Sequence, residues 1–523
     1  MMSLSESKYF RIFGPPGTGK TTRLLNEIDD LIMQGVQPNK IGFFAFTRKA
    51  ANEARDRAVT RFGLDHEDLV HFRTLHSFCF RHSGINFDQL MSKENWRELS
   101  DQTDFNFTWE PGDPDAVENL STALPDVRTV LGLITMARLK QITIRQAYDN
   151  WEEAYKYPWP QILYLWKCYE DYRKSTRSFD FTDMLTVFLE KADQLCPSFH
   201  TVFVDEAQDL SRLQWRVVQA IADKSDRVIV AGDDDQAIFR WAGADVDSFL
   251  KLPGASETLS KSWRVPVAVH ALAENIASRI SDRYPKTYTP QEGYGKVHYV
   301  HSIRSILDDL EEGTWLILAQ CAYMLDDAEE EIRTAGLFYE MKNRKSVPEK
   351  VLMAIAAWMK LQDYTSKEIN GKEVRAIYSY LHVGNGLARG FKAAAQVEDD
   401  DLVTYGDLVR DVGLLASDYD PWHTVLTKMP EAHRVYLRAV ENRGENIGER
   451  PRITLSTIHG AKGGEADNVV LYTDISYASI RESSATEAGD NDLHRTFYVG
   501  VTRTKQQLFL VSPKSVREAY LLE

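Results

Sequence analysis

The chain has 523 residues, of which 43% are hydrophobic and 27% are charged, and its formal net charge is −15 at pH 7. These values are typical of a globular protein with several cores, and the acidic balance argues against a protein that simply coats nucleic acid. They leave open a protein that binds nucleic acid through one local groove. The four cysteines lie far apart and form no C-x-x-C pair, which indicates neither a zinc site nor a disulfide framework.

The first eight residues are polar and lack the apolar core of a signal peptide. No apolar run in the chain approaches the length of a membrane span. Because the cysteine spacing also fits a reducing compartment, the sequence predicts a cytoplasmic protein without a membrane partner.

The first motif follows an apolar run at residues 9–13, which predicts a buried strand, and a helical pattern begins at Thr21. The spacing G-x-x-x-x-G-K-[ST] between a strand and a helix is typical of a P-loop. Backbone N–H groups of such a loop surround a polyphosphate, while Lys20 would reach the β/γ-phosphates and the Thr21 hydroxyl would bind Mg²⁺. The predicted nucleotide-binding residues of this loop are Gly14, Pro15, Pro16, Gly17, Thr18, Gly19, Lys20, Thr21 and Thr22.

Short apolar runs alternate with helical patterns along much of the chain. Such alternation predicts α/β cores with parallel sheets. The expected strands, after the first, are residues 41–46, 201–204, 228–231, 315–319, 453–456, 469–472 and 508–511.

Two long segments have another character. Residues 84–177 are rich in tryptophan and tyrosine, and Ile162, Leu165, Trp166 and Tyr169 share one helical face. Core packing is favoured for this stripe over a nucleic-acid surface. Residues 343–448 also have a largely helical pattern, and no strand is predicted there. Two α/β cores, each interrupted by a helical insertion, are the simplest description.

A second phosphate element reads V-F-V-D-E-A-Q-D-L at residues 202–210. An apolar strand that ends in paired acids is the arrangement of a Walker B site, where Asp205 would hold Mg²⁺ and Glu206 would polarise the attacking water. The alternative is a solvated acidic pair at a strand end, which the P-loop in the same chain disfavours.

The run V-D-E-A-Q-D resembles motif II of superfamily 1 helicases of the UvrD/Rep type. The other motifs of that family appear in the family's order: motif Ia at residues 44–55, Ib at 72–78, III at 230–244, IV at 259–264, V at 453–470 and VI at 497–504. The resemblance implies an α/β fold with two RecA-like parallel-sheet cores, each with a mainly helical insertion. It places the first core at residues 1–83 and 178–258 around an insertion at 84–177, and the second core at 259–342 and 450–523 around an insertion at 343–449.

The resemblance also implies roles at the nucleotide. Gln236 matches the sensor of the γ-phosphate, and Arg264 and Arg503 match two arginines that neutralise transition-state charge. Trp263 stands where the family usually has a tyrosine stacked on adenine, and Glu465 matches a ribose contact. The predicted catalytic set is Lys20, Asp205, Glu206, Gln236, Arg264 and Arg503, with ATP and Mg²⁺ as cofactors.

On the DNA side, the resemblance implicates aromatic residues as base-stacking faces and hydroxyl, histidine and lysine side chains as phosphate contacts. Two alternatives stay open: Trp241 packs a core, and His459 is a structural histidine. The predicted DNA-binding residues are Phe46, Thr47, Thr74, His76, Phe239, Trp241, His459 and Lys462.

Some positions depart from the family pattern. No glutamine precedes Gly14, Gly464 stands where leucine is common, and Ala242 replaces a frequent arginine.

The resemblance implies an ATP-dependent DNA helicase that moves 3′ to 5′ on single-stranded DNA, with single-stranded and forked DNA as partners, alongside single-strand-binding, replication or repair proteins. The alternative is a translocase that strips proteins from single strands without unwinding. A catalytically dead scaffold is disfavoured because Lys20, Glu206 and Arg503 are present.

Overall fold

The computed structural model describes residues 8–46, 48–107, 125–341, 344–362, 368–391 and 397–522. The chain forms two compact units. Unit 1 comprises Met1–Val265, Glu274–Glu292 and Ser483–Tyr498, and unit 2 comprises Pro266–Ala273, Gly293–Glu482 and Val499–Glu523. Three helices are divided between the units by this partition: α12 (Val267–Ala277), α19 (Tyr477–Ala485) and α20 (Glu487–Val501).

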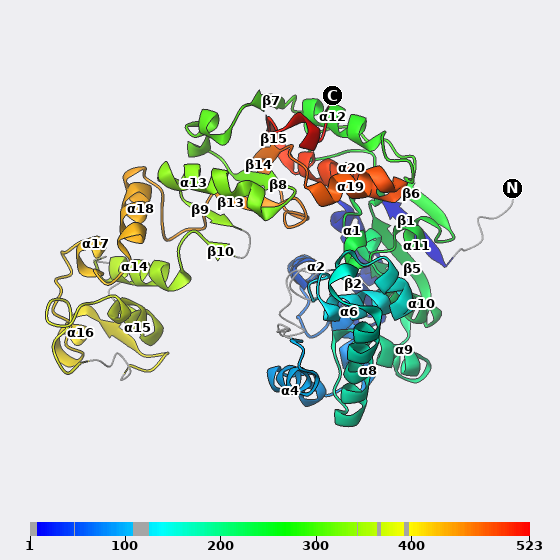
Figure 1. The fold of residues 1–523 in the computed structure, drawn as a ribbon, viewed down its shortest axis with the longest axis horizontal. Helices are drawn as coiled ribbons and strands as arrows, with labels where there is room; N and C mark the ends of the chain where they lie inside the picture. The colour runs from blue at the N-terminus through cyan, green and yellow to red at the C-terminus, as the bar shows by residue number, and fades with distance from the viewer. Residues whose placement is uncertain are drawn as a thin grey trace. The chain divides into compact units, whose positions relative to one another are not determined.

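Unit 1 contains a six-stranded sheet in its described residues (Figure 1). Every neighbouring pair of strands is parallel, as the alternation of strand and helix patterns predicts. The strand order is β3 (Phe72–Thr74), β2 (Ile41–Ala45), β4 (Phe199–Val204), β5 (Ser225–Gly232), β1 (Tyr9–Phe13) and β6 (Ala255–Thr258).

The sheet of unit 1 is covered on both faces because its strands are apolar on both. Along β4, Val202 and Val204 pack in a cluster with α3, α9 and α10, whereas Phe203 between them packs in a cluster with α1 and α2. The helices that follow the strands are α1 (Lys20–Met33), α2 (Arg48–Phe62), α3 (Leu75–Ser83), α9 (Phe181–Leu195), α10 (Arg212–Asp223) and α11 (Val246–Leu250).

The first helical insertion has its own small core in unit 1. Ile162, Leu165 and Tyr169 are buried in it and Trp166 packs against it, so the stripe is a packing face, as predicted. The helices of this insertion are α4 (Lys93–Thr103), α6 (Val130–Lys140), α7 (Ile144–Asp149) and α8 (Trp159–Thr176).

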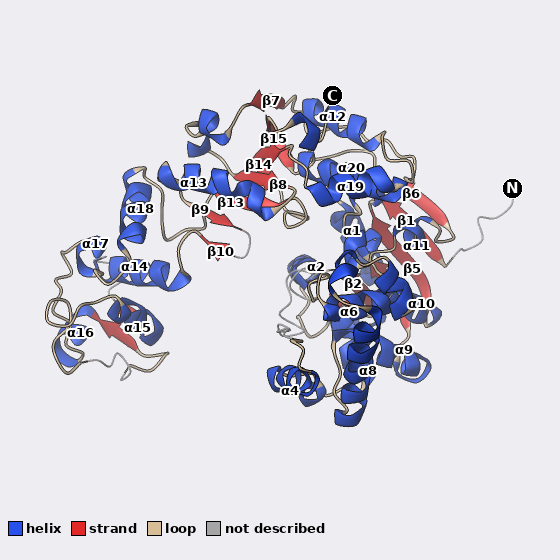
Figure 2. Cartoon of the chain, viewed as in Figure 1, coloured by secondary structure: helices blue, strands red, loops and turns tan. Residues whose placement is uncertain are grey.

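Unit 2 contains a seven-stranded sheet in its described residues (Figure 2). All neighbouring strands are parallel except β10, which is antiparallel to β9 at the edge. The order is β10 (Arg344–Lys345), β9 (Tyr339–Met341), β13 (Ile453–Thr457), β8 (Trp315–Ala319), β14 (Ala466–Tyr472), β15 (Thr504–Val511) and β7 (Lys296–Val300). The prediction of two parallel-sheet cores is confirmed.

The second insertion shares one hydrophobic cluster with one face of the unit 2 sheet, which includes Ile317 and Leu455. It is mainly helical, but a two-stranded antiparallel sheet, β11 (Glu368–Asn370) with β12 (Leu402–Thr404), corrects the expectation that this segment has no strand. These strands are three residues long with one fully buried side chain, Ile369, so they leave no periodic pattern. The helices of unit 2 are α13 (Asp326–Thr334), α14 (Glu349–Gln362), α15 (Gly371–Ser379), α16 (Tyr405–Asp411), α17 (Trp422–Val425) and α18 (Glu431–Asn442).

Within the described residues, no helix combines the length and the apolar character that crossing a bilayer requires.

Candidate active site

The carboxyl ends of three neighbouring strands bring the predicted phosphate motifs together in unit 1. β1 ends at Phe13, β4 at Val204 and β5 at Gly232, and the register pairs Phe13 with Gly232. The residues that follow are Gly14, Asp205 and Asp233. In parallel sheets the ligand site lies outside the carboxyl ends of the strands, so this edge is where a nucleotide site is expected.

The P-loop has a backbone that requires glycine at two positions. Gly17 has φ of 71° and Gly19, the N-cap of α1, has φ of 79°, both in the left-handed region. Gly14 donates its N–H to the Gly232 carbonyl at 2.9 Å, which ties the start of the loop to β5. The loop therefore leads into a 14-residue helix whose N-terminus carries a partial positive charge at the predicted phosphate site.

Two side chains of the P-loop point toward the Walker B strand. The Lys20 ammonium donates to the Gly14 carbonyl at 2.9 Å and lies 3.9 Å from Glu206 Oε1. The Thr21 hydroxyl donates to Asp205 Oδ2 at 3.0 Å. Lys20, Thr21, Asp205 and Glu206 thus form one cluster, as the sequence motifs predict.

Asp205 is buried, and the surrounding charges do not offset its burial. Desolvation, followed by the neighbouring Glu206 carboxylate, raises the pKa of Asp205 to about 6 although Lys20 and Thr21 lower it. A buried carboxylate beside a hydroxyl is a pair of hard oxygen ligands, which suits Mg²⁺ held by few protein groups and several waters. Thr21 and Asp205, which bond to each other, are thus residues whose chemistry fits a magnesium ion.

Glu206 has an unusual backbone for a residue with a side chain. Its φ is 53° and its ψ is 41°, in the left-handed region that non-glycine residues seldom occupy. It is the N-cap of the short helix η4 (Ala207–Asp209), and its N–H donates to Asp205 Oδ1 at 2.9 Å. The Gln208 amide donates to Glu206 Oε2 at 2.6 Å. The turn thus directs the Glu206 carboxylate toward Lys20.

Motif III begins with three consecutive buried acids, Asp233, Asp234 and Asp235, whose side chains have no exposed surface. Lys286 is 1% exposed and its ammonium lies 3.3, 2.7 and 2.7 Å from these three carboxylates in turn. Arg283 adds two bonds to Asp235, at 2.9 and 2.6 Å. The three carboxylates raise the pKa of Lys286 against the effect of its burial, so the ammonium stays charged.

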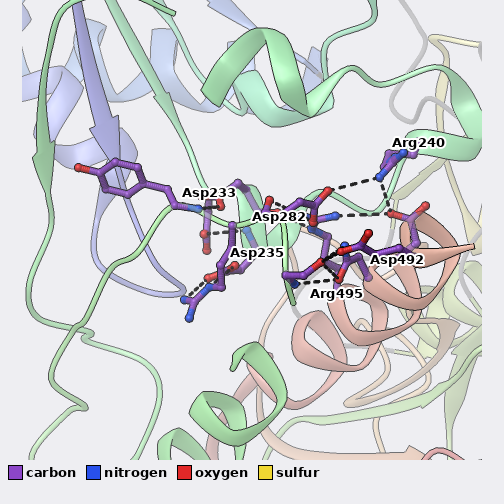
Figure 3. Close-up of polar contacts among 12 residues, drawn as sticks. Asp233, Asp235, Arg240, Asp282, Asp492 and Arg495 are labelled. Atoms are coloured by element: carbon purple, nitrogen blue, oxygen red, sulfur yellow. Dashed lines mark hydrogen bonds and ion pairs between the residues drawn. The ribbon is translucent and has the colours of Figure 1, made fainter. Parts of the chain in front are cut away.

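A second group of charged residues lies beside this acidic triplet (Figure 3). Arg495 Nε donates to the Asp234 carbonyl at 2.9 Å, and its guanidinium lies 2.8 Å from Asp282 and 3.7 Å from Asp492. Arg240 lies 3.7 Å from each of the same two carboxylates. These contacts hold two residues of motif III, Asp234 and Arg240, against segments that are distant in the sequence.

The helix η5 (Asp234–Gln236) positions the predicted γ-phosphate sensor. Gln236 is buried, and its amide donates to Asp233 Oδ2 at 2.7 Å. Three residues later the chain reaches Phe239, whose ring stacks on Phe46 with centroids 5.8 Å apart and meets Trp241 edge-on at 6.2 Å. Trp241 is 44% exposed, so it does not pack in a core.

The other predicted DNA contacts of unit 1 are less exposed. Thr74 is the N-cap of α3, where its hydroxyl accepts a bond from the Ser77 N–H at 3.2 Å. His76 lies beside Phe181, and burial lowers the pKa of its imidazole to about 4. The imidazole is therefore neutral at pH 7 and offers a phosphate a hydrogen bond but no charge. Thr47 lies outside the described residues.

Motif IV contacts the P-loop within unit 1. Ser262 donates its hydroxyl to the Pro16 carbonyl and Trp263 its N–H to the Gly17 carbonyl, both at 2.8 Å. A Cβ added at Gly17 would lie 2.4 Å from Arg264 Cβ, so this glycine also makes room for Arg264. Trp263 is 69% exposed beside the Lys261 ammonium. The structure thus brings Trp263 and Arg264 to the predicted nucleotide loop.

Four predicted residues belong to unit 2. Arg503 is buried, and it donates to the carbonyl oxygens of Val499 at 3.0 Å and Gly464 at 3.3 Å. Glu465 pairs with Lys505 at 2.8 Å. His459 and Lys462 are half-buried in the turns that follow β13.

Sequence reasoning missed the residues that hold motif III in place, namely Gln208, Arg283, Lys286 and Arg495. One signal was present: three consecutive acids after an apolar strand need cations if they are buried. The sequence does not say which of the 62 lysines and arginines supply them.

Comparisons with known proteins give two matching family models and named relatives. Residues 3–255 match the family model of the UvrD/REP helicase N-terminal domain, and residues 426–515 match that of the UvrD-like helicase C-terminal domain. The chain is similar to the ATP-dependent DNA helicase PcrA of Bacillus subtilis (strain 168), at 24% identity over 95% of this chain and 80% of the relative. It is also similar to PcrA of Staphylococcus aureus (strain Mu50), at 26% identity over 56% of this chain and 41% of the relative.

Proposed function

Because the chain belongs to the UvrD/Rep type of superfamily 1 helicases, a class of ATP-hydrolysing DNA helicases, we propose that it moves 3′ to 5′ on single-stranded DNA and unwinds duplex DNA. One observation supports this proposal above the others. A single sheet edge carries the phosphate motifs after β1 and β4, and the aromatic residues Phe46 and Phe239 contact each other beside them. Nucleotide chemistry and base stacking therefore share one rigid element.

The proposed chemistry assigns one task to each side chain. The Lys20 ammonium binds the β/γ-phosphates, and Glu206 accepts a proton from the attacking water. Thr21 and Asp205 would hold Mg²⁺, which neutralises phosphate charge when bound. Arg264, beside Gly17, is the proposed stabiliser of transition-state charge from motif IV, and Arg503 stays the predicted second arginine.

Movement on DNA requires that nucleotide state change the affinity for the strand. Gln236 and Trp241 are five residues apart in the sequence, with one at the proposed γ-phosphate and the other exposed as a stacking face. A shift of η5 when the γ-phosphate leaves would therefore move the aromatic cluster directly. Single-stranded and forked DNA are the proposed substrates, and a cytoplasmic location stays a prediction.

The decisive experiment compares duplexes that carry a 3′ or a 5′ single-stranded tail, with Lys20→Ala as the inactive control. We expect ATP-dependent strand separation from the 3′ tail alone, and release of streptavidin from a biotin at the 5′ end of a single strand. Release of streptavidin without strand separation would instead support a translocase that strips proteins. Separation from the 5′ tail alone would overturn the proposed direction.

A further inference from the structure

Gln208, which follows the Walker B acids, contacts both Glu206 and the start of the acidic triplet at Asp233 in unit 1. Its side chain has no exposed surface and lies on η4 between the ends of β4 and β5. The amide Nε2 donates to Glu206 Oε2 at 2.6 Å and to Asp209 Oδ2 at 3.2 Å. The amide Oε1 accepts the Asp233 N–H at 2.9 Å. The partners lie between residues 206 and 233 and belong to two different strand ends.

The partners of Gln208 fix the orientation of its amide. Carboxylates accept hydrogen bonds and do not donate them, whereas a backbone N–H only donates. The amide NH₂ must therefore face Glu206 and Asp209, and the amide oxygen must face Asp233. A glutamine side chain can donate to the two carboxylates and accept from the Asp233 N–H at the same time. A glutamate of the same length would place an acceptor against the two carboxylates.

The backbone near Gln208 leaves space for its amide. A Cβ at Gly232 would lie 2.7 Å from Gln208 Oε1 and 3.1 Å from the Phe249 ring, so β5 ends in a residue without one. Beyond it, the Asp233 carboxylate accepts the Gln236 amide at 2.7 Å. A chain of hydrogen bonds thus runs from Glu206 through Gln208 and Asp233 to Gln236.

We propose that Gln208 is a positioning residue for ATP hydrolysis, which orients the Glu206 carboxylate and joins it to the backbone of motif III. This proposal rests on the proposed function, because it requires Glu206 to act as the base. The Glu206 side chain is 32% exposed and would otherwise sample several rotamers. A base is effective only when a third group holds it on the proton it must accept, and Gln208 is that group here.

The test is a double-mutant cycle on DNA-stimulated ATP hydrolysis with Gln208→Met and Glu206→Gln. Methionine has a similar length but forms none of the three hydrogen bonds of the amide. We expect Gln208→Met to lower kcat by roughly tenfold to a hundredfold, as a misplaced catalytic group does, with a much smaller change in KM for ATP. In the Glu206→Gln background, the same substitution should change kcat by less than about twofold, since no base remains to position.

Gln214→Met is the matched control. Gln214 is also buried in unit 1, and its side chain accepts the Ser211 N–H at 2.8 Å in the capping box of α10 without contacting Glu206. We expect it to lower the melting temperature and to leave kcat unchanged. If Gln208→Met does not fold, Gln208→Asn withdraws the amide by one methylene group and replaces it in the cycle.

Two failures are distinguishable. If Gln208→Met lowers kcat by the same factor in both backgrounds, Gln208 acts independently of Glu206 and the positioning role is wrong, while the base assignment stands. If Glu206→Gln retains near-normal turnover, the base assignment and the role of Gln208 are both overturned.

Discussion

Two acidic clusters follow neighbouring strands of the same sheet, yet their charges are balanced in opposite ways. At the end of β5, three buried carboxylates face Lys286 and Arg283 at hydrogen-bonding distance. At the end of β4, Asp205 is equally buried, but its nearest cation is Lys20, whose ammonium bonds to the Gly14 carbonyl. In the first cluster, cations of the protein bond directly to the carboxylates, whereas the described bonds of Asp205 are with the Thr21 hydroxyl and the Glu206 N–H.

This difference distinguishes the acidic residues that hold the backbone in place from those that are proposed to bind a ligand. A compensated cluster has its charges satisfied in the folded chain and holds backbone in place. A buried carboxylate with no bonded cation favours a proton or a cation, and the raised pKa of Asp205 agrees with that preference. Burial raises the pKa of Asp234 as well, although the bonded Lys286 ammonium lowers it, so the bonded cations and not the pKa direction distinguish the two strand ends. We therefore assign ligand chemistry to the end of β4 and positioning of Gln236 to the end of β5.

The largest effect is expected from Lys286→Met. Removing the cation leaves buried carboxylates without their shared partner, which costs about 3–5 kcal/mol of folding free energy. A matched double variant, Lys286→Met with Asp234→Asn, removes one negative charge as well and should recover part of the loss. Unfolding in urea, followed by tryptophan fluorescence, measures both. An unchanged unfolding midpoint in Lys286→Met would mean that the end of β5 does not depend on this compensation.

How far the sequence predicts the fold depends on how each strand is buried. Residues 41–45 and 315–319 are buried throughout, and continuous apolar runs identified both as strands. β6 (residues 255–258) and β7 (residues 296–300) are edge strands with exposed side chains, and their pattern does not differ from a loop. These two buried strands are thus predictable from composition, whereas β6 and β7 depend on pairing that only the folded chain supplies.

The residues of the candidate site also fall into two classes, those that a local sequence motif predicts and those that only the folded chain brings into place. Lys20, Thr21, Asp205 and Glu206 lie in motifs whose spacing reflects local geometry, and the fold brings them together as expected. Lys286 lies about fifty residues from the acids that it contacts. No local pattern marks it, because its role arises from a tertiary contact.

An intermediate effect is expected from Trp241→Ala, which tests whether the segment after β5 contributes to DNA binding and the segment after β4 to phosphate chemistry. If motif III positions the stacking face, the variant should lose about 1–3 kcal/mol in single-strand binding, the usual contribution of one base stack. Its ATP hydrolysis without DNA should persist, because no phosphate contact is removed. Fluorescence anisotropy with a labelled oligonucleotide and a coupled ATPase assay measure the two quantities.

The control for Trp241 is Trp215→Ala, since Trp215 is 8% exposed and packs in the core of unit 1. We expect this variant to lower the melting temperature, whereas Trp241→Ala should leave it nearly unchanged because Trp241 is 44% exposed. A large drop in melting temperature for Trp241→Ala, together with lost DNA-free hydrolysis, would show that it acts as a core residue.

The smallest effect concerns the proton on Asp205. Its pKa is about 6 in the folded chain and 3.8 in the reference state, so the folded chain binds more protons between these values. Stability contributed by this group is therefore present at low pH and is lost as pH rises through about 6. Between pH 5 and pH 7 the loss is about 1 kcal/mol in the absence of divalent metal.

Asp205→Asn tests this sign, because asparagine resembles the protonated acid and does not titrate. The free energy of unfolding of the variant minus that of the unmodified chain should be about 1 kcal/mol larger at pH 7 than at pH 5. Urea unfolding in the presence of a chelator measures both values. Asp30→Asn on the exposed face of α1 is the control, and its effect should not vary with pH. An equal effect of Asp205→Asn at both pH values would show that the Asp205 carboxylate does not bind a proton between pH 5 and pH 7 in the folded chain. The contrast between the two strand ends would then rest on the bonded cations alone.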